Sequence, residues 1–534
     1  MNQNNQHETR NLILALVLMT AVWFGFSLLF PSKPSVPVPE TAAPAVATSA
    51  APAQVNPAPT LAAQPLTATP VAPAREIEVE TTLYRAVFTS AGAKLTGFEL
   101  KRYFQAAGGA APRVELVPRG QSTLQTSAGG GLTLGVDASY LLDETRNRIT
   151  LDAGGKETLT FRHVTSSGVE VLKSYTFHAD SYTIDTTLTL RNAGNAPLTG
   201  TLDLVLSEAW DASKKDSYSF SGPALLLGKD LEQVDVDDLA KGAKSFGPEA
   251  TWTSLQSKYF IMAAVPLSGA AEKISVAHES GQLRSALQTP LLTLQGGERR
   301  QFDYQLFFGP KDPEQLKAAG HGLDLAINFG WFDLLAQPLF HVLTFFNGFV
   351  KNYGWSIILL TVILKLLFWP LTHKSYASMK AMQKLQPEMQ KLRDKHKNDK
   401  ERLNRELMEL YKKHSVNPLG GCLPMLVQIP VFFALYKVLL EAIALRHAPF
   451  MLWITDLSAK DPYYITPLLM GASMFVQQKM TPTSMDPMQA KIFLFMPVIF
   501  TFLFLNFPSG LVIYWLVNNL LTIAQQLYIN KRVT

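Results

Sequence analysis

A single charged residue, Lys365, interrupts the otherwise uncharged apolar stretch at residues 353–371. A charge near the middle of a bilayer costs ~2.5–3.5 kcal/mol on insertion scales, so it must face water, a partner or a bundle interior. Lys365 lies seven residues before Thr372, which places it roughly 10 Å from that end of a helical span. No Asp or Glu lies deep in a candidate span to pair with it, which favours water beside Lys365. The alternative is a lysine stem that snorkels toward the headgroups without a function.

Further polar residues recur within the apolar part of the chain. Each of them, taken alone, is typical of a hydrogen bond between two membrane helices. Together they are consistent with a wet lining on the inner half of a bundle. They are Thr361, Gln428, Gln477, Gln478, Thr501, Asn518, Asn519, Gln525 and Gln526.

The sequence offers little to enzyme chemistry. It contains no Walker motif, no GxSxG and no HExxH, so neither nucleotide-driven transport nor hydrolysis has support. The only cysteine, Cys422, lies among apolar residues, which excludes an intramolecular disulfide and gives a metal site no support. The net charge of +5 is too small to indicate nucleic acid. We expect no enzymatic activity, no cofactor, no metal and no direct nucleic-acid specificity.

The N-terminal part predicts an anchor followed by a tether. Residues 11–30 carry no charge, and twenty helical residues span ~30 Å, one hydrocarbon core. We therefore interpret residues 1–30 as a retained transmembrane anchor. A cleaved signal peptide is the alternative, although its apolar region is normally ~7–15 residues long. Residues 31–75 are rich in Pro and Ala, which predicts a semi-extended tether.

Residues 76–325 have the pattern of a large β domain. Apolar residues alternate with polar ones between Tyr182 and Leu190, which is the period of a strand with one wet face. A similar alternation runs from Val169 to Phe177 just before it, and residues 192–195 supply a turn. Many short strands separated by turns favour an antiparallel sandwich of two sheets.

The C-terminal part, residues 351–530, predicts a five-span helical core. The stretch at 353–371 is the first candidate span. Four more follow at about 420–440, 463–480, 491–507 and 509–529. Residues 374–414 hold twelve Lys/Arg against six Asp/Glu, and short basic segments stay in the cytoplasm.

The charge rule also fixes the expected topology. With the N-terminus inside and the β domain outside, one span at 353–371 returns the basic segment to the cytoplasm, and the C-terminus also ends inside. A further span at 326–350 would place the basic segment outside. This stretch is moreover broken by Asp333, Pro338 and His341. We therefore interpret residues 326–350 as an interfacial helix.

The basic segment 374–414 has the pattern of a helical hairpin. One apolar stripe runs from Met379 to Leu392 and another from Leu403 to Leu410. Asn398 with Glu401 three residues later predicts the start of the second helix. A solvated antiparallel coiled coil and an arm that docks a ribosome, a partner or lipid headgroups both remain open.

Several motifs resemble the YidC/Oxa/Alb membrane protein insertase family in order and spacing. They are residues 417–424 (NPLGGCLP), 446–450 (RHAPF), 461–464 (DPYY), 486–489 (DPMQ) and 507–510 (FPSG). The layout of anchor, tether and large β domain resembles the Gram-negative YidC type.

The resemblance implies a membrane α-helical bundle, made of a five-span insertase core plus an N-terminal anchor span. It also implies a large periplasmic all-β supersandwich domain, similar in fold to sugar mutarotases, and a cytoplasmic helical hairpin. The family's groove opens to cytoplasm and lipid and usually holds an arginine, where this sequence has Lys365. Carried over by position, the substrate groove comprises Lys365, Thr361, Gln428, Phe432, Met470, Leu503, Tyr514 and Trp515.

The function that the resemblance implies is insertion, and chaperoned folding, of proteins in the bacterial inner membrane. The expected partners are nascent inner-membrane proteins, the Sec translocon with its accessory subunits, the lipid bilayer, and a ribosome or signal recognition pathway through the 374–414 hairpin. Two other classes stay in view. A solute transporter would need a pathway through to the outside, and a periplasmic sugar-active enzyme would need activity in the β domain alone.

Overall fold

The structure is a computed structural model that describes residues 68–532 except 109–110, 213–218, 268, 397–398, 415, 417–422 and 482–486. The predicted anchor at 1–30, the tether as far as residue 67, Cys422 and Asn398 lie outside the described residues. So do most of the 417–424 motif and Asp486.

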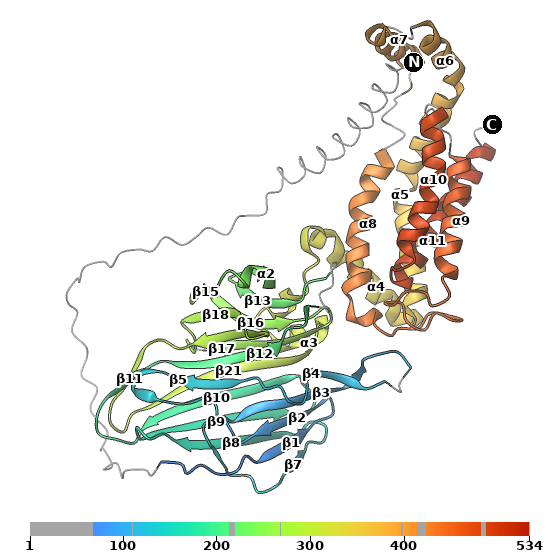
Figure 1. The fold of residues 1–534 in the computed structure, drawn as a ribbon. Helices are drawn as coiled ribbons and strands as arrows, with labels where there is room; N and C mark the ends of the chain where they lie inside the picture. Colours follow the sequence, from blue (N-terminus) through green and yellow to red (C-terminus); the bar gives the residue numbers. More distant parts are fainter. Residues whose placement is uncertain are drawn as a thin grey trace. The chain divides into compact units, whose positions relative to one another are not determined.

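The β domain is built on one large sheet of nine strands (Figure 1). In spatial order they are β14 (Asp230–Gln233), β13 (Gly222–Leu227), β16 (Ala250–Gln256), β17 (Phe260–Leu267), β21 (Arg299–Pro310), β10 (Thr183–Asn192), β9 (Val169–His178), β8 (Lys156–Val164) and β6 (Leu141–Leu142). Every neighbouring pair in this sheet is antiparallel, as the sequence predicts.

Two five-stranded sheets accompany it. The first runs β4 (Arg113–Val117), β3 (Lys94–Phe104), β2 (Tyr84–Thr89), β1 (Glu76–Glu80) and β7 (Arg148–Thr150). The second runs β15 (Lys244–Phe246), β18 (Lys273–Glu279), β19 (Gln282–Gln288), β12 (Leu202–Ala209) and β5 (Gln125–Ala128). A short ribbon joins β11 (Leu198–Gly200) to β20 (Leu292–Leu294). The pairing of β1 with β7 is parallel, which the sequence pattern did not predict.

The alternation read from the sequence is confirmed in β9 and β10. Ile184, Leu188 and Leu190 are fully buried, whereas Asp185 and Arg191 point to solvent. The period of two follows from the pleat, which turns successive side chains to opposite faces of the sheet. One face of the large sheet is therefore free to pack against a second layer.

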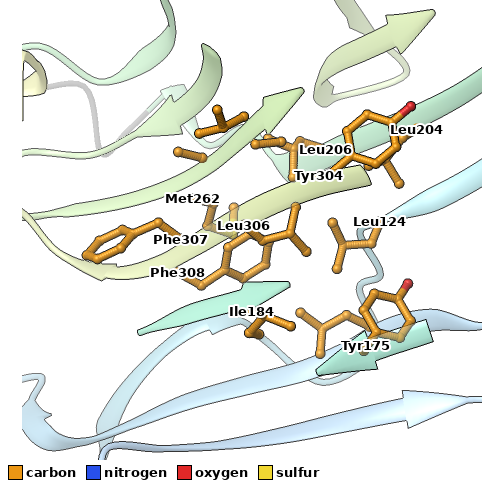
Figure 2. Packing of buried hydrophobic residues seen from close by; sticks show 14 of the residues in the cluster. Leu124, Tyr175, Ile184, Leu204, Leu206, Met262, Tyr304, Leu306, Phe307 and Phe308 are labelled. Atoms are coloured by element: carbon orange, nitrogen blue, oxygen red, sulfur yellow. The ribbon is translucent and has the colours of Figure 1, made fainter. Parts of the chain in front are cut away.

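The smaller sheets pack on that large sheet and complete the sandwich. Phe88 of β2 lies 4.6 Å from Tyr175 of β9, measured between ring centroids, and Phe98 of β3 lies 5.5 Å from Phe308 of β21. On the other smaller sheet, Leu204 and Leu206 of β12 are fully buried in the same core. Figure 2 shows side chains from β10, β12, β17 and β21 gathered in this core.

One lysine is buried within the β core. The Nζ of Lys173 donates a hydrogen bond to the Leu124 carbonyl oxygen at 2.6 Å and lies 5.5 Å from the centroid of the Tyr175 ring. Burial lowers the pKa of Lys173 well below its usual value, because the charged form loses water. A carbonyl and an aromatic face replace that water, so Lys173 has a structural explanation.

Short helices connect the β domain to the helical part. The domain itself contains the turn η1 (Gly130–Leu132) and helix α2 (Val236–Leu239). After β21 follow α3 (Pro313–Ala319), η3 (Leu323–Ala326) and η4 (Gly330–Phe332). Asp312 caps α3 by accepting a hydrogen bond from the Gln315 backbone N–H at 3.1 Å.

The helical part contains α4 (Asp333–Val350), α5 (Tyr353–Lys384), α6 (Gln386–Lys395), α7 (Lys400–Lys413), α8 (Leu423–Glu441), η6 (Ile443–Leu445), α9 (Ile465–Met480), α10 (Pro487–Phe504) and α11 (Ser509–Arg532) (Figure 1). A helix therefore covers most of each predicted span. Helix α5 packs against α4, α8 and α11, whereas α10 packs against α9, and α9 also packs against α11.

Helix α5 is longer than the sequence predicts. The expected span ends at residue 371, but the helix continues through Pro370 to Lys384 without a break. Its 32 residues measure ~48 Å, more than the ~30 Å hydrocarbon core. The apolar pattern ends where the membrane would end, whereas good helix formers such as Lys, Ala and Met carry the helix further.

The basic segment contains two helices that pack on each other, and the cytoplasmic coiled-coil hairpin stays a prediction. Met382, Leu385 and Met389 form a small core that packs against Leu407 and Leu410, among others. Helix α6 has a proline in its first turn, as expected for Pro387. The cap of α7 is Asp399, whose side chain accepts from the Arg402 backbone N–H at 3.0 Å. The expectation that Asn398 begins this helix is therefore wrong by one residue, because either side chain suits the position.

By length and composition, α5 is the one helix in the described part of the chain that is long and apolar enough to cross a membrane. Helix α9 has only 16 residues, fewer than the ~20 that a straight span needs. Helix α11 has 24 residues but carries Asn518, Asn519, Gln525 and Gln526, which lower its hydropathy. Five spans therefore remain a prediction.

Helix α4 has apolar side chains on both its buried and its exposed sides. Its Ala336, Phe340 and Leu343 are buried in the bundle core, whereas Leu334 and Phe349 are largely exposed. A helix with one apolar face in a core and another exposed suits an interface between bundle and headgroups. The interfacial interpretation of residues 326–350 stays a prediction.

Candidate functional site

Lys365 lies partly buried on α5 and is held by a neutral partner. Its Nζ donates a hydrogen bond to the Thr522 hydroxyl oxygen of α11 at 2.7 Å. The Thr522 hydroxyl in turn donates to the backbone carbonyl of Asn518 at 2.6 Å. A hydroxyl orients the ammonium group without neutralising it, so the positive charge stays available to a second group.

A chain of polar side chains continues from this pair to α8. The Gln428 amide nitrogen donates to the Asn518 side-chain oxygen at 3.3 Å. Tyr514, one turn of α11 away, lies close to Gln428. The helices α5, α11 and α8 thus contribute to one polar ladder that consists of Lys365, Thr522, Asn518, Gln428 and Tyr514.

A second polar group joins α11 to α9 and to the end of α5. The Asn519 amide donates to Ser473 at 3.1 Å, and the Gln526 amide donates to Tyr376 at 2.7 Å. These contacts are the interhelical hydrogen bonds expected of single polar residues. Gln525 differs, because it is 2% exposed and both its amide atoms lack a partner among the described residues. A buried amide of this kind calls for water or another polar group.

An aromatic notch opens between α8 and α10, with α11 behind it. The cavity has a volume of about 330 Å³. The Phe432 ring lies edge-on to Trp515, with 4.6 Å between the ring centroids, and Phe504 lies 5.2 Å from Trp515. The residues that line the notch are Phe432, Phe433, Tyr436, Phe500, Leu503, Phe504, Phe507, Leu511 and Trp515.

The notch and the lysine lie at different depths along α11. Trp515 and Thr522 are seven residues apart, which corresponds to ~10 Å along a helix. Tyr514 connects the two levels, because it lies close to Gln428 and stacks on Phe432 with 6.3 Å between ring centroids. An apolar surface is thus joined to a polar, positively charged one.

The structure brings together most residues of the predicted groove. Phe432, Leu503 and Trp515 line the notch, and Lys365, Gln428 and Tyr514 belong to the polar ladder.

Two predicted groove residues are buried and belong neither to the notch nor to the polar ladder. Met470 is fully buried in the core of the bundle, so it packs rather than offers a sliding surface. Thr361 is also buried, and its hydroxyl donates to the backbone carbonyl of Ile357 at 2.6 Å. The sequence did not identify Thr522, although its spacing of four from Asn518 places both on one helix face. Phe500 and Phe504 were also missed.

A larger cavity of about 620 Å³ lies in the β domain, on the five-stranded sheet that begins with β4. Charged side chains line it, and several pair with one another. Arg85 donates to Glu78 at 2.5 Å, and Arg113 donates to Glu99 at 2.9 Å. Two of its acidic residues, Glu78 and Glu99, are thus already paired with arginines.

Comparisons with known proteins identify both halves of the chain. The family described as YidC periplasmic domain matches residues 76–342, and the family described as 60Kd inner membrane protein matches residues 345–534. A membrane protein insertase YidC from Geobacter sulfurreducens is 46% identical over 526 residues, covering 98% of this chain and 98% of the relative.

Two solved structures are also similar. A crystal structure of an active YidC insertase with its first transmembrane domain resolved is 20% identical, covers 87% of this chain and 94% of its own, and has a TM-score of 0.36. A galactose mutarotase-like protein from Lactobacillus casei is 11% identical, covers 44% of this chain and 99% of its own, and has a TM-score of 0.30. The expected likeness to mutarotases stays a prediction.

The family matches cover the β domain and the helical part, and the identity to the Geobacter sulfurreducens protein extends over nearly the whole chain. The chain therefore belongs to the YidC family of inner-membrane protein insertases, with a periplasmic all-β domain and a helical C-terminal region, and it is not an enzyme.

Proposed function

We propose that this insertase seats a polar or acidic outer segment of its client beside Lys365, while the client's apolar stretch leaves through the aromatic notch. The observation that carries the proposal is the hydrogen bond from Lys365 to the Thr522 hydroxyl. A carboxylate partner would cancel the charge, whereas a hydroxyl leaves it to attract a client carboxylate in a medium less polar than water.

The proposed topology places five spans at α5, α8, α9, α10 and α11, with both termini in the cytoplasm. The basic segment 374–414 lies inside, the β domain outside, and α4 at the outer interface. The excess of lysine and arginine in that segment supports the orientation. Polar residues along α11 then line a groove that is wet from the cytoplasmic side.

The driving force is the transfer of the client's apolar surface from water to lipid. Each square ångström of apolar surface removed from water contributes ~25 cal/mol. A twenty-residue apolar segment therefore supplies far more free energy than the ~2.5–3.5 kcal/mol cost of one charge held partway across. The chain needs no nucleotide for this step, and Lys365 lowers the barrier for the polar part alone.

The aromatic notch is suited to the lateral release of the client's apolar stretch into the lipid. Its wall is aromatic, and Leu503 and Phe433 at its rim are partly exposed. A client helix that leaves the groove would exchange contacts with these side chains for contacts with lipid tails, at little cost in apolar burial.

The proposed partners are nascent inner-membrane proteins, the Sec translocon with its accessory subunits, and a ribosome or signal recognition pathway. The hairpin of α6 and α7 supports the last of these. Most of its apolar residues, such as Met389, Leu407 and Leu410, pack in its own small core, so its outer surface carries the basic side chains.

The test is a charge series at position 365 in cells depleted of the native protein. Lys365→Arg should restore growth and client insertion, whereas Lys365→Ala should not, because the field rather than the lysine shape is needed. Lys365→Met keeps the apolar stem and separates charge from packing. Equal complementation by all three variants would show that Lys365 only snorkels. Solute flux through the purified protein in liposomes would instead favour a transporter.

A further inference from the structure

The turn at residues 450–453 presents an exposed leucine in a strained backbone. Leu452 has a φ of +54° and is 77% exposed, and the neighbouring Met451 is 44% exposed. The left-handed region is disfavoured for leucine because its Cβ crowds the following carbonyl oxygen. Glycine would fill the position without strain, so an exposed leucine there needs a reason.

Backbone hydrogen bonds close the turn. The Phe450 N–H donates to the Ile454 carbonyl at 3.0 Å, and the Ile454 N–H donates to the Met451 carbonyl at 3.1 Å. The conformation of Leu452 is thus fixed by its neighbours.

The turn is fastened to the start of α5 on one side. The Asn352 amide donates to the Phe450 carbonyl at 2.9 Å, while the Asn352 side-chain oxygen caps α5 by accepting from the Trp355 N–H at 3.2 Å. The Phe450 ring lies directly on Gly354, where a Cβ atom would come within 2.0 Å of it. Only glycine leaves room for this contact.

The turn is fastened to the start of α9 on the other side. The Trp453 indole N–H donates to the Asp461 carboxylate at 3.1 Å, and the Thr466 backbone N–H and hydroxyl both donate to the same carboxylate at 2.7 Å. Asp461 is fully buried. The turn that contains the strained Leu452 is therefore held by hydrogen bonds to the starts of both α5 and α9.

The segment after the turn is also fastened to the start of α11. The Ser509 N–H donates to the Ala459 carbonyl at 2.7 Å, and the Gly510 N–H donates to the Leu457 carbonyl at 2.9 Å. The motifs 446–450, 461–464 and 507–510, which carry the family resemblance, thus meet at one end of the bundle. Their shared role is to fix this turn at the starts of three helices.

Aromatic side chains surround this end of the bundle. Trp355 is 46% exposed and lies edge-on to Phe450, with 5.7 Å between ring centroids. Tyr463 is 65% exposed, and the ammonium of Lys460 lies 5.8 Å from the centroid of the Tyr464 ring. Tryptophan, tyrosine and lysine together are typical of the level where acyl chains meet headgroups.

We propose that Met451 and Leu452 insert among the acyl chains of the outer leaflet and anchor the shared outer end of α5, α9 and α11 to the membrane. The proposal rests on α5 spanning the bilayer, as proposed above. Insertion explains both the strained backbone of Leu452 and the exposure of Met451 and Leu452. The turn directs these two apolar side chains into lipid, while its polar backbone groups stay hydrogen-bonded within the protein.

The test measures the depth of a nitroxide at position 452 by electron paramagnetic resonance. The variants carry Cys422→Ser, and the label is placed at Leu452→Cys in the full chain, in vesicles of phosphatidylethanolamine and phosphatidylglycerol. Reference labels go at Leu367→Cys on α5, which is 68% exposed, and at Leu291→Cys of the β domain, which is 71% exposed.

The expected result is that the label at 452 relaxes with oxygen rather than with a water-soluble nickel complex, as the label at 367 does and the label at 291 does not. Met451→Cys supplies a second measurement with the same expectation. A water-accessible label at 452 beside a lipid-protected label at 367 would overturn the anchor and leave the span intact. Protection of 452 only when a ribosome-bound client is present would overturn it in favour of a client contact. A water-accessible label at 367 would overturn the span itself.

Discussion

The hydrogen bond between Lys365 and Thr522 leads to a quantitative prediction, namely that the two residues are energetically coupled. The perturbation is Thr522→Val, which keeps the side-chain shape and removes the hydroxyl that accepts from Lys365 at 2.7 Å. Thr372→Val is the matched control, because Thr372 also donates to the backbone carbonyl four residues earlier, that of Phe368.

The expected magnitude follows from the kind of bond. Interhelical hydrogen bonds in membranes average ~0.6 kcal/mol and reach ~1.7 kcal/mol, while bonds to charged groups in proteins contribute ~1.5–3 kcal/mol. A charged donor at 2.7 Å belongs at the upper end of the membrane range. We expect Thr522→Val to lower the free energy of unfolding by about 1–2 kcal/mol in the native background. In the Lys365→Met background it should change that free energy by less than about 0.5 kcal/mol, the usual limit of additivity.

The assay is a double-mutant cycle on the full chain in mixed micelles, unfolded by increasing the fraction of denaturing detergent and followed by circular dichroism. A coupling energy near 1–2 kcal/mol would show that the Lys365 ammonium group interacts with Thr522 of α11. If Thr522→Val has the same effect in both backgrounds, Lys365 does not rest on Thr522 and the snorkelling alternative is correct.

Three further predictions concern the notch, the shared outer end and the β domain. Phe432→Ala should slow client insertion several-fold in proteoliposomes without a matching loss of thermal stability, because the ring borders an open notch; an unchanged rate would exclude the notch as exit. Gly354→Val should lower the free energy of unfolding by about 1–3 kcal/mol through overpacking, whereas Gly348→Val, with no atom within 4 Å of its Cβ, should have little effect in the same unfolding assay. Hydrogen bonds from Arg148 and Lys101 lower the pKa of Glu80 from 4.5 to about 2. The ionised Glu80 therefore stabilises the fold fully above pH 4.5, and this contribution is lost as the pH falls toward 2. Glu80→Gln should flatten the loss of stability in that window, and an unchanged pH profile of unfolding would show that Glu80 is not so paired.

Local patterns in the sequence predicted the parts of the fold that depend on local periodicity. The strands β9 and β10 were predicted because their apolar residues repeat every second position. The continuation of α5 to Lys384 was missed, because hydropathy reports where a membrane ends and not where a helix ends. The parallel pairing of β1 with β7 joins distant segments and leaves no local signal.

The sequence predicted those site residues whose chemical type differs from that of their neighbours in the chain. Lys365 was evident as a lone charge, whereas its partner Thr522 is 157 residues away and has an ordinary side chain. Phe500 and Phe504 were missed because α10 is apolar on all sides, so no face of it is marked. Met470 was assigned to the groove by position, but packing buries it. Tertiary contacts decide these cases.

The most direct test of the groove is capture of a client beside Lys365. A photoreactive amino acid replaces Gln428, which belongs to the polar ladder, and a ribosome translates a short single-span protein with an acidic outer segment. The matched control carries the same group at Leu291 in the β domain, which is 71% exposed. The groove account predicts a crosslink to the nascent chain from position 428 that weakens in the Lys365→Met background, and none from 291. Absence of any captured nascent chain at 428, in a protein that still inserts its client, would contradict it.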